Sequence, residues 1–301
     1  MQSIAEMIYI ILPAFNEAQA IPRLLPAIRT CLAGYSYRII VLDDGSTDQT
    51  NKIVERFHQT EPRIRLVALR RNRGKSAALM AGFKAVTGDQ IITIDADLQD
   101  DPDEIPNLLR TMSEQDVDLV GGWKQKRKDP LVKLISSRVF NGIANRIMGT
   151  NFRDLNCGLK AYRREVVDSL DLYGDLYRFI PLLAVAQGWK ATEIPVQHHA
   201  RQWGVSKYGL RLSGLFDLIS LLMITKYRWR PLHFFGRWGA LLFLIGLIML
   251  GYLTAQHFMG MAIGNRPLLI FGVLFCLVGL QLLFTGLLGD LILQTNSRAK
   301  K

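Results

Sequence analysis

Two aspartates separated by one residue, Asp95 and Asp97, follow an apolar run and form the sharpest chemical signal in the chain. Carboxylates at this spacing, on a turn that leaves a strand, can bind Mg²⁺ or Mn²⁺ through hard oxygen ligands, and such a cation bridges the phosphates of a substrate. Gln99 offers a further carbonyl oxygen. The alternative is a solvated acidic loop that caps the next helix, a role that the acids just downstream share.

Three more polar clusters follow apolar runs. A carboxylate at Asp44 or Glu17 can accept hydrogen bonds from a nucleotide base or from ribose hydroxyls, and a turn-and-cap role is the alternative for both. The run Asn72-Arg73-Gly74-Lys75 can cradle a phosphate, because glycine permits close backbone approach and a helix N-terminus follows. It is neither a GxGxxG nor a P-loop pattern. No glycine fingerprint follows the first strand either, which disfavours an NAD-dependent oxidoreductase.

The elements that must position these residues alternate between strands and helices. Apolar runs predict strands at 8–12, 38–42, 64–69 and 90–94. Helices are predicted at 21–32, 76–86 and 103–112. A further helix, which the hydroxyls of Ser46 and Thr47 can cap, is predicted to extend to about residue 57. This alternation predicts an α/β fold with a doubly wound, mostly parallel sheet. Ligands of such sheets bind beyond the carboxyl ends of the strands, where all the polar clusters fall.

Beyond residue 120 the pattern loosens. Residues 130–148 predict a basic amphipathic helix, 154–164 a polar loop and 193–196 a short strand. His198 and His199 are neighbours that do not face each other in a regular element, so a surface or packing role is favoured over a metal or base role. Arg201 and Lys207 lie in a Trp/Tyr-rich stretch that suits an anionic lipid phosphate, with interfacial anchoring as the alternative.

The last third of the chain is apolar. Uncharged runs of 19 residues (238–256) and 23 residues (267–289) are long enough to span a bilayer, and 212–224 suits an interfacial helix. A buried helical hairpin is the alternative. The connecting loop has one Arg, whereas Lys and Arg gather before the first run and after the second. This predicts that both termini and the globular domain that precedes the apolar runs face the cytoplasm. The expected organisation is a globular domain at 1–210, interfacial helices at 211–236 and two spans at 237–301.

The formal net charge of +11 gathers around residues 124–138 and 226–237. No nucleic-acid motif accompanies either cluster, and the second adjoins an apolar run, so a lipid surface is its predicted partner. The three cysteines are odd in number, far apart and in no ligand spacing. We therefore expect reduced thiols, with neither a disulfide framework nor a zinc site.

The ordered motifs resemble a known family, the family 2 glycosyltransferases of GT-A fold. The resemblance is carried by Ile11–Glu17, Asp43–Asp48, Arg73-Gly74-Lys75 and Asp95–Pro102. The loop 154–163, the run 193–196, the run 201–208 and the two C-terminal apolar runs narrow it to the polyprenyl-phosphate glycosyltransferases, such as dolichol-phosphate mannose synthases and bacterial undecaprenyl-phosphate glucosyltransferases. The resemblance extends over nearly the whole chain.

The resemblance implies a nucleotide-sugar donor and a polyprenyl phosphate acceptor. A divalent cation held by Asp95, Asp97 and Gln99 would bind the diphosphate, and Asp97 and Asp154 are the predicted catalytic residues, Asp154 orienting the sugar or the acceptor. The donor site would comprise Pro13, Phe15, Glu17, Leu42, Asp44, Lys75, Asp95, Ala96 and Asp97. The lipid phosphate would contact Arg127, Arg138, Arg201 and Lys207.

Two departures from the family pattern affect this expectation. The family often has Gly-x-Arg where this chain has Gly122-Trp123-Lys124, and Ser-Gly-Phe-Arg where it has Cys157-Gly158-Leu159-Lys160. A lysine at the second place loses the bidentate fork of arginine, which affects contacts to the sugar or the acceptor.

A phosphate acceptor is anionic at pH 7, since its second pKa is about 6, so single displacement with inversion needs no strong general base. The sugar is left open, with UDP-glucose preferred over GDP-mannose. A processive polysaccharide synthase and a non-catalytic membrane scaffold are the rival functions. The expected location is the cell inner membrane, and a homo-oligomer is left open.

Overall fold

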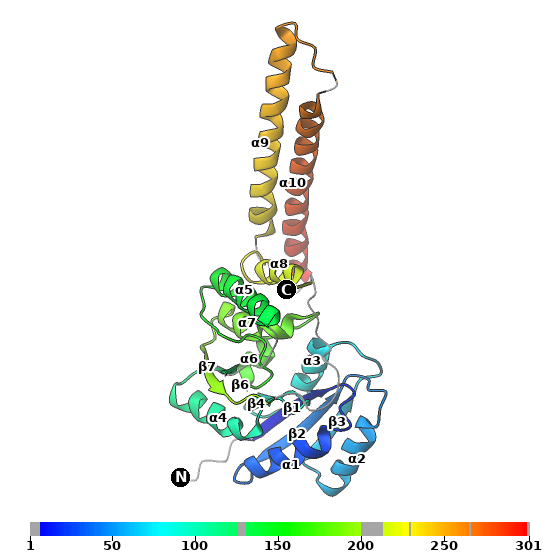
Figure 1. The fold of residues 1–301 in the computed structure, drawn as a ribbon, viewed down its shortest axis with the longest axis vertical. Helices are drawn as coiled ribbons and strands as arrows, with labels where there is room; N and C mark the ends of the chain where they lie inside the picture. Colours follow the sequence, from blue (N-terminus) through cyan, green and yellow to red (C-terminus); the bar gives the residue numbers. More distant parts are fainter. Residues whose placement is uncertain (1–6, 126–130, 200–212, 229, 265, 300–301) are drawn as a thin grey trace. The chain divides into compact units, whose positions relative to one another are not determined.

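The computed structural model describes residues 7–125, 131–199, 213–228, 230–264 and 266–299. The chain forms two compact units, Met1–Leu218 and Ile219–Lys301. The first is built on a seven-stranded sheet (Figure 1). Its strands are β1 (Ile8–Ala14), β2 (Tyr37–Asp43), β3 (Ile64–Ala68), β4 (Gln90–Thr93), β5 (Leu119–Lys124), β6 (Lys160–Arg163) and β7 (Ala191–Val196). Its helices are α1 (Ile21–Cys31), α2 (Thr50–Thr60), α3 (Lys75–Ala85), α4 (Ile105–Glu114), α5 (Leu131–Met148), α6 (Arg164–Ser169) and α7 (Ile180–Ala186), with short 3₁₀ turns η1 (Pro102–Glu104) and η2 (Leu176–Phe179).

The strand order β3-β2-β1-β4-β6-β5-β7 confirms the predicted doubly wound, mostly parallel sheet. Strands β1, β2, β3 and β4 are mutually parallel, and β7 runs parallel to β5. Helices cover both faces. Alternate residues of β1, such as Ile10 and Leu12, share a core with α1 and α4, whereas Gly82 of α3 lies against Ile11 and Leu42 on the other face. The parallel strands therefore end at one edge of the sheet and bring their following loops together.

The prediction of a polar loop over residues 154–164 is wrong for its last part. Residues 160–163 form β6, which runs antiparallel between β4 and β5 in the middle of the sheet. Lys160 is 4% exposed and Tyr162 is fully buried. The strand is only four residues long and begins and ends with a basic residue, so its sequence shows neither a long apolar run nor strict alternation.

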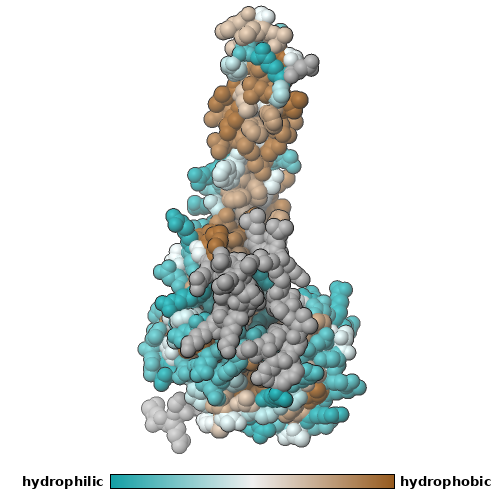
Figure 2. All heavy atoms as spheres, in the orientation of Figure 1, coloured by the Kyte–Doolittle hydropathy of each residue, from teal (hydrophilic) through white to brown (hydrophobic). Residues whose placement is uncertain are grey.

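The second unit is a helical hairpin of α9 (Pro231–Phe258) and α10 (Pro267–Ala299), and α8 (Ser213–Thr225) crosses the boundary between the units. Both long helices meet the length and hydropathy needed to cross a membrane. Only 17% and 11% of their most apolar windows are buried, unlike the core helix of a soluble protein. Apolar side chains accordingly form a broad band on the visible surface of the hairpin, with hydrophilic side chains on either side of the band (Figure 2). Helix α9 begins at Pro231, so it includes residues predicted to belong to the interfacial segment.

Candidate active site

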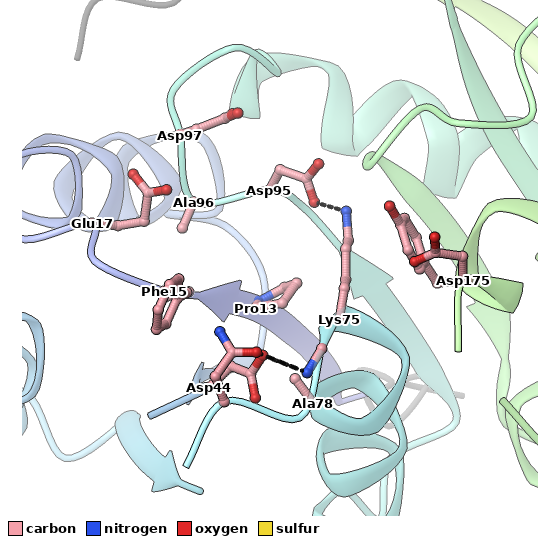
Figure 3. A pocket seen from close by; sticks show the side chains of 14 residues that line it. Pro13, Phe15, Glu17, Asp44, Lys75, Ala78, Asp95, Ala96, Asp97 and Asp175 are labelled. Atoms are coloured by element: carbon pink, nitrogen blue, oxygen red, sulfur yellow. Dashed lines mark hydrogen bonds and ion pairs between the residues drawn. The ribbon is translucent and has the colours of Figure 1, made fainter. Parts of the chain in front are cut away.

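A cavity of about 390 Å³ lies beyond the carboxyl ends of β1, β2 and β4 (Figure 3). The structure brings together there eight of the nine residues predicted for the donor, since Leu42 alone lies elsewhere. Leu42 is 1% exposed and packs toward Gly82 of α3. The lining residues are Pro13, Ala14, Phe15, Glu17, Asp44, Asn72, Gly74, Lys75, Ala78, Asp95, Ala96, Asp97, Asp175 and Tyr177.

One wall of the cavity is the loop that follows β1. Asn16 has a left-handed backbone (φ 58°), which asparagine tolerates better than most residues. The backbone N–H of Asn16 donates to Ser46 Oγ at 2.8 Å, and its side-chain Oδ1 accepts from the backbone N–H of Thr47 at 2.8 Å. The backbone N–H of Glu17 donates to Thr50 Oγ1 at 3.0 Å. These bonds tie the loop to the turn after β2 and bring Glu17 to the cavity.

Asp44 binds the loop between β3 and α3. Its carboxylate accepts from the backbone N–H groups of Arg73 and Gly74 at 2.7 and 2.8 Å. An ideal Cβ on the neighbouring Gly45 would lie 2.5 Å from the Arg71 carbonyl carbon, so these two loops are tightly packed. Asp44 therefore supports the proposed phosphate loop as well as lining the cavity.

Lys75 and Asp95 form an ion pair inside the cavity (Figure 3). The Lys75 ammonium also lies 5.0 Å from the ring centroid of Tyr177. Burial alone would lower the pKa of Lys75, but the Asp95 carboxylate outweighs it, and the pKa is raised. Lys75 thus stays cationic where it faces the predicted diphosphate site, and it links the phosphate loop to the aspartate pair.

Asp97 lies on a tight turn, next to Leu98 in a left-handed conformation (φ 59°). The Asp97 carboxylate accepts from the Gln99 backbone N–H at 3.2 Å. Carboxylate oxygens and the side-chain carbonyl oxygen of Gln99 are the hard donors that Mg²⁺ and Mn²⁺ prefer, so Asp95, Asp97 and Gln99 would be the residues to hold such a cation. In the described part of the chain, protein side chains alone form no cluster of three or more His, Cys, Asp or Glu ligands.

Asp154 is buried outside the cavity lining. The backbone N–H groups of Arg153 and Asp154 donate to the Glu193 carboxylate, with Arg153 at 2.8 Å and Asp154 at 3.4 Å. Asp154 itself accepts from Asn156 N–H at 3.2 Å. Strand β7, through Glu193, therefore fixes the loop that carries Asp154.

The two lysines that depart from the family pattern both point inward, Lys160 buried and Lys124 half-buried. The Lys124 ammonium lies 3.8 Å from the Asp100 carboxylate, and the Lys160 ammonium donates to the Cys157 carbonyl. Burial lowers the pKa of Lys160. Gly158 lies between two aspartates: its ideal Cβ would lie 2.6 Å from Asp95 Oδ2 and 2.7 Å from Asp100 Oδ2.

The structure does not describe the side chains of the four predicted lipid-phosphate residues. Arg127, Arg201 and Lys207 lie outside the described residues, and Arg138 belongs to α5 but its side chain is not described. Their roles stay predictions.

Asp175 and Tyr177 line the cavity but were missed by reasoning from the sequence. They reach it from the segment before α7, where the Tyr177 backbone N–H donates to Ser76 Oγ at 3.1 Å. That bond joins residues 101 positions apart, so no local pattern signals it. The aromatic and acidic residues around the short run 173–179 were the one available hint.

Comparisons with known proteins show which sugar transferases the chain resembles. The profile of glycosyl transferase family 2 matches residues 9–171. The dodecaprenyl-phosphate galacturonate synthase of Rhizobium johnstonii is 37% identical over 96% of this chain and 88% of its own length. The undecaprenyl-phosphate 4-deoxy-4-formamido-L-arabinose transferase of Klebsiella pneumoniae is 38% identical over 94% of this chain and 87% of its own.

Solved structures support the fold. Glucosyl-3-phosphoglycerate synthase from Mycobacterium tuberculosis, in complex with Mn²⁺, UDP and phosphoglyceric acid, matches with a TM-score of 0.57 at 22% identity, over 73% of this chain and 78% of that one. The predicted GT-A fold is confirmed, as is the resemblance to polyprenyl-phosphate enzymes. The cavity at the strand ends, the Asp95–Asp97 pair and the family match over residues 9–171 together place the chain in glycosyltransferase family 2.

Proposed function

We propose that the chain transfers a sugar from a nucleotide-sugar to polyprenyl phosphate, with inversion, at the cytoplasmic face of the cell inner membrane. The observation that carries the proposal is the cavity that unites Glu17, Asp44, Lys75 and the Asp95–Asp97 pair. Relatives named for polyprenyl-phosphate sugar transfer match almost the whole chain, and α9 and α10 supply the membrane-spanning length.

The proposed roles follow from position. Phe15 and Glu17 lie at one side of the cavity and suit the base and ribose, whereas Lys75 lies opposite and suits the diphosphate (Figure 3). Asp95 and Asp97, with Gln99, would hold a divalent cation, which when bound neutralises charge on the departing nucleoside diphosphate. The ammonium of Lys75 adds a second positive charge to that site.

The acceptor needs alignment rather than activation. A phosphate monoester, with a second pKa of about 6, is a dianion for much of its population at pH 7 and attacks the anomeric carbon directly. The protein must therefore hold the phosphate opposite the leaving group and exclude water. Asp154 is proposed to orient the sugar or the acceptor from a loop held by Glu193.

A screen of nucleotide-sugar donors identifies which sugar is transferred. The motif resemblance favours UDP-glucose over GDP-mannose, whereas the relatives are named for galacturonate and 4-deoxy-4-formamido-L-arabinose. Purified full-length protein with Mn²⁺ and undecaprenyl phosphate is given each labelled nucleotide-sugar, and products are separated by chromatography. We expect a lipid-linked monosaccharide. A polymer would support a processive synthase, and no product with any donor would support a scaffold.

Two matched variants test the site. Asp97→Asn should abolish transfer. Asp168→Asn changes an exposed carboxylate in α6 that pairs with Arg164, outside the cavity lining, and should leave transfer unchanged.

The membrane topology is tested with two single-cysteine substitutions, Met261→Cys in the loop between α9 and α10 and Gln59→Cys in α2. An impermeant maleimide added to intact cells should label the introduced cysteine of the Met261→Cys variant and not that of the Gln59→Cys variant.

A further inference from the structure

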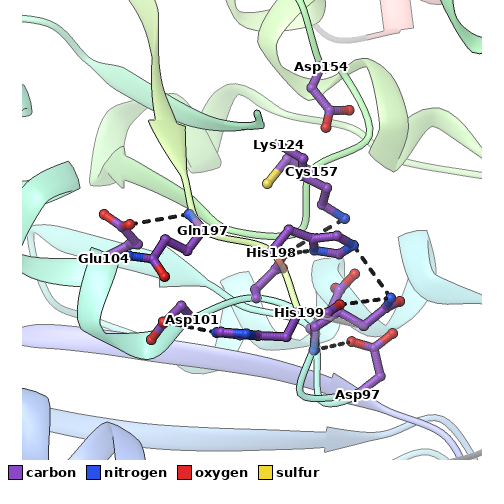
Figure 4. Close-up of polar contacts among 12 residues, drawn as sticks. Asp97, Asp101, Glu104, Lys124, Asp154, Cys157, Gln197, His198 and His199 are labelled. Atoms are coloured by element: carbon purple, nitrogen blue, oxygen red, sulfur yellow. Dashed lines mark hydrogen bonds and ion pairs between the residues drawn. The ribbon is translucent and has the colours of Figure 1, made fainter. Parts of the chain in front are cut away.

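Residues 197–199, just after β7, run alongside residues 99–101 of the loop that carries Asp97 (Figure 4). The His199 backbone N–H donates to the Gln99 carbonyl at 2.8 Å, and His198 forms an antiparallel bridge with Asp100. We call this pairing of 197–199 with 99–101 the clasp. It joins segments about a hundred positions apart in the chain.

Side chains form an outer layer of the clasp. His199 Nε2 lies 3.0 Å from Asp101 Oδ2, and the His199 side chain is 52% exposed. The Gln99 amide nitrogen lies 3.4 Å from His198 Nε2 and 3.5 Å from the His199 carbonyl oxygen. The nitrogen end of Gln99 therefore faces the clasp, which leaves its carbonyl oxygen as the end available to a cation.

An inner layer lies beneath. Asp100 is 2% exposed, and among the described residues neither of its carboxylate oxygens has a hydrogen-bond partner. The ammonium of Lys124 lies 3.8 Å from this carboxylate and compensates part of its charge, and His198 Nδ1 lies 3.7 Å from it. A buried carboxylate is costly without a charged neighbour, so the contact of Asp100 with Lys124 helps to hold β5 beside the loop that carries Asp97.

The turn that this pairing borders is strained. Leu98 has φ 59°, a left-handed conformation that side chains other than those of Gly, Asn and Asp adopt reluctantly. Such conformations persist where the surrounding structure over-determines them, and they cluster at functional sites. The clasp supplies that constraint immediately after the strained residue, and Asp97 lies immediately before it.

The same strand also fixes the second predicted catalytic loop. Glu193 of β7 accepts from the backbone N–H groups of Arg153 and Asp154. One strand therefore contacts both the loop of Asp97, through its C-terminal extension, and the loop of Asp154, through its side chain. This shared support is absent from any local sequence pattern.

We propose that the clasp is a positioning device for the divalent-cation site, with His199 as a positioning residue that holds Asp97 and Gln99 in ligating geometry through Asp101. The inference rests on the proposed function, because it assumes that Asp97 and Gln99 receive a cation. It adds residues that do not line the cavity.

The test compares three variants of the full-length protein. His199→Ala removes the outer layer from a half-exposed site, and His199→Gln restores a side-chain donor of similar reach. Lys190→Ala is the matched control. Lys190 immediately precedes β7, at the end away from the clasp, and its ammonium lies 3.0 Å from Asp116 Oδ2. Each variant is measured for Mn²⁺ affinity in the presence of UDP, by Mn²⁺ paramagnetic resonance, and for amide hydrogen exchange across residues 95–101.

We expect His199→Ala to weaken Mn²⁺ binding about fivefold to tenfold, as for one partly exposed charge-assisted hydrogen bond, and to speed exchange across 95–101. His199→Gln should restore both, and Lys190→Ala should match the wild type. Unchanged exchange in His199→Ala, faster exchange with unchanged affinity, or no restoration by glutamine would each overturn the proposal. If the wild type binds Mn²⁺ neither with UDP nor with GDP, the proposed function fails instead, and exchange alone then decides whether the clasp braces the loop.

Discussion

Adding one methyl group at Gly158 should disable the aspartate pair. An ideal Cβ at this position would lie 2.4 Å from Asp95 Cγ, 2.6 Å from Asp95 Oδ2 and 2.7 Å from Asp100 Oδ2. Contacts this short cannot exist, so either the backbone of Gly158 or the two carboxylates must move in Gly158→Ala.

The backbone is the harder part to move. The Gly158 carbonyl accepts from Thr93 Oγ1 at 2.8 Å in the middle of the sheet, and the next residue accepts from Gly122 N–H at 2.9 Å. Asp95 must therefore give way, and its ion pair with Lys75 must break or shift. Overpacking of this kind costs about 1–3 kcal/mol, which corresponds to roughly a fivefold to 150-fold effect if it falls on binding.

The assay separates a local effect from a global one. Donor kcat/KM and Mn²⁺ affinity with UDP are measured for Gly158→Ala and for Gly121→Ala, together with the melting temperature of each. Gly121 is a matched control in neighbouring β5, because its Cβ would meet nothing closer than Thr192 O at 3.9 Å. We expect Gly121→Ala to behave as the wild type and Gly158→Ala to lose at least about fivefold in both functional measures. Wild-type kcat/KM and Mn²⁺ affinity in Gly158→Ala would refute the assignment of Asp95 to the donor site.

Three further predictions concern the hairpin, the thiols and acid stability. In Gly279→Leu, a Cβ would lie 2.5 Å from the Phe243 backbone N, so the packing of α9 on α10 should be lost and the melting temperature in detergent should fall, whereas Gly251→Leu, with open space around it, should not change it. Burial raises the pKa of Cys31 to about 12 and that of Cys157 still further, so neither thiol should react with Ellman's reagent at pH 8 until the protein unfolds, and rapid labelling of the native protein at either position would contradict this. Burial opposes ionisation of Asp48, but hydrogen bonds from Thr50 and from the Ala18 N–H lower its pKa below the ordinary 3.8. Its contribution to stability is then complete above pH 3.8 and lost as pH falls through the lower folded-state pKa. The difference in unfolding free energy between the wild type and Asp48→Asn should therefore shrink only below pH 3.8. A difference that does not depend on pH would rule this out.

Much of the fold could be read from local patterns. Each apolar run that ends in a polar cluster became a strand that ends in a loop at the cavity, because the hydrophobic period and the turn chemistry act over a few neighbouring residues. The hairpin is equally local, since uncharged length alone decides whether a helix suits lipid. These signals also explain why Asp95, Asp97, Asp44 and Glu17 could be grouped from the order of residues along the chain.

Strand β6 was beyond such reasoning. It inserts antiparallel between β4 and β5, and its charged ends conceal a strand whose neighbours in the sheet come from residues about 40 or more positions earlier. Its position depends on which strands it pairs with, and that is a property of the whole sheet.

The sequence by itself determined which carboxylates and basic residues follow the strand ends, and so which residues are proposed to bind a nucleoside diphosphate and a cation, because residue type and position at a strand end are local facts. Only the tertiary structure decided how those residues are held: the ion pair of Lys75 with Asp95, the placement of Tyr177 in the cavity wall, and the pairing of 197–199 with the loop that carries Asp97. Each of these contacts joins segments separated by 20 to about 100 residues. Their free energy depends on burial and distance across the folded chain, which no window of neighbouring residues contains.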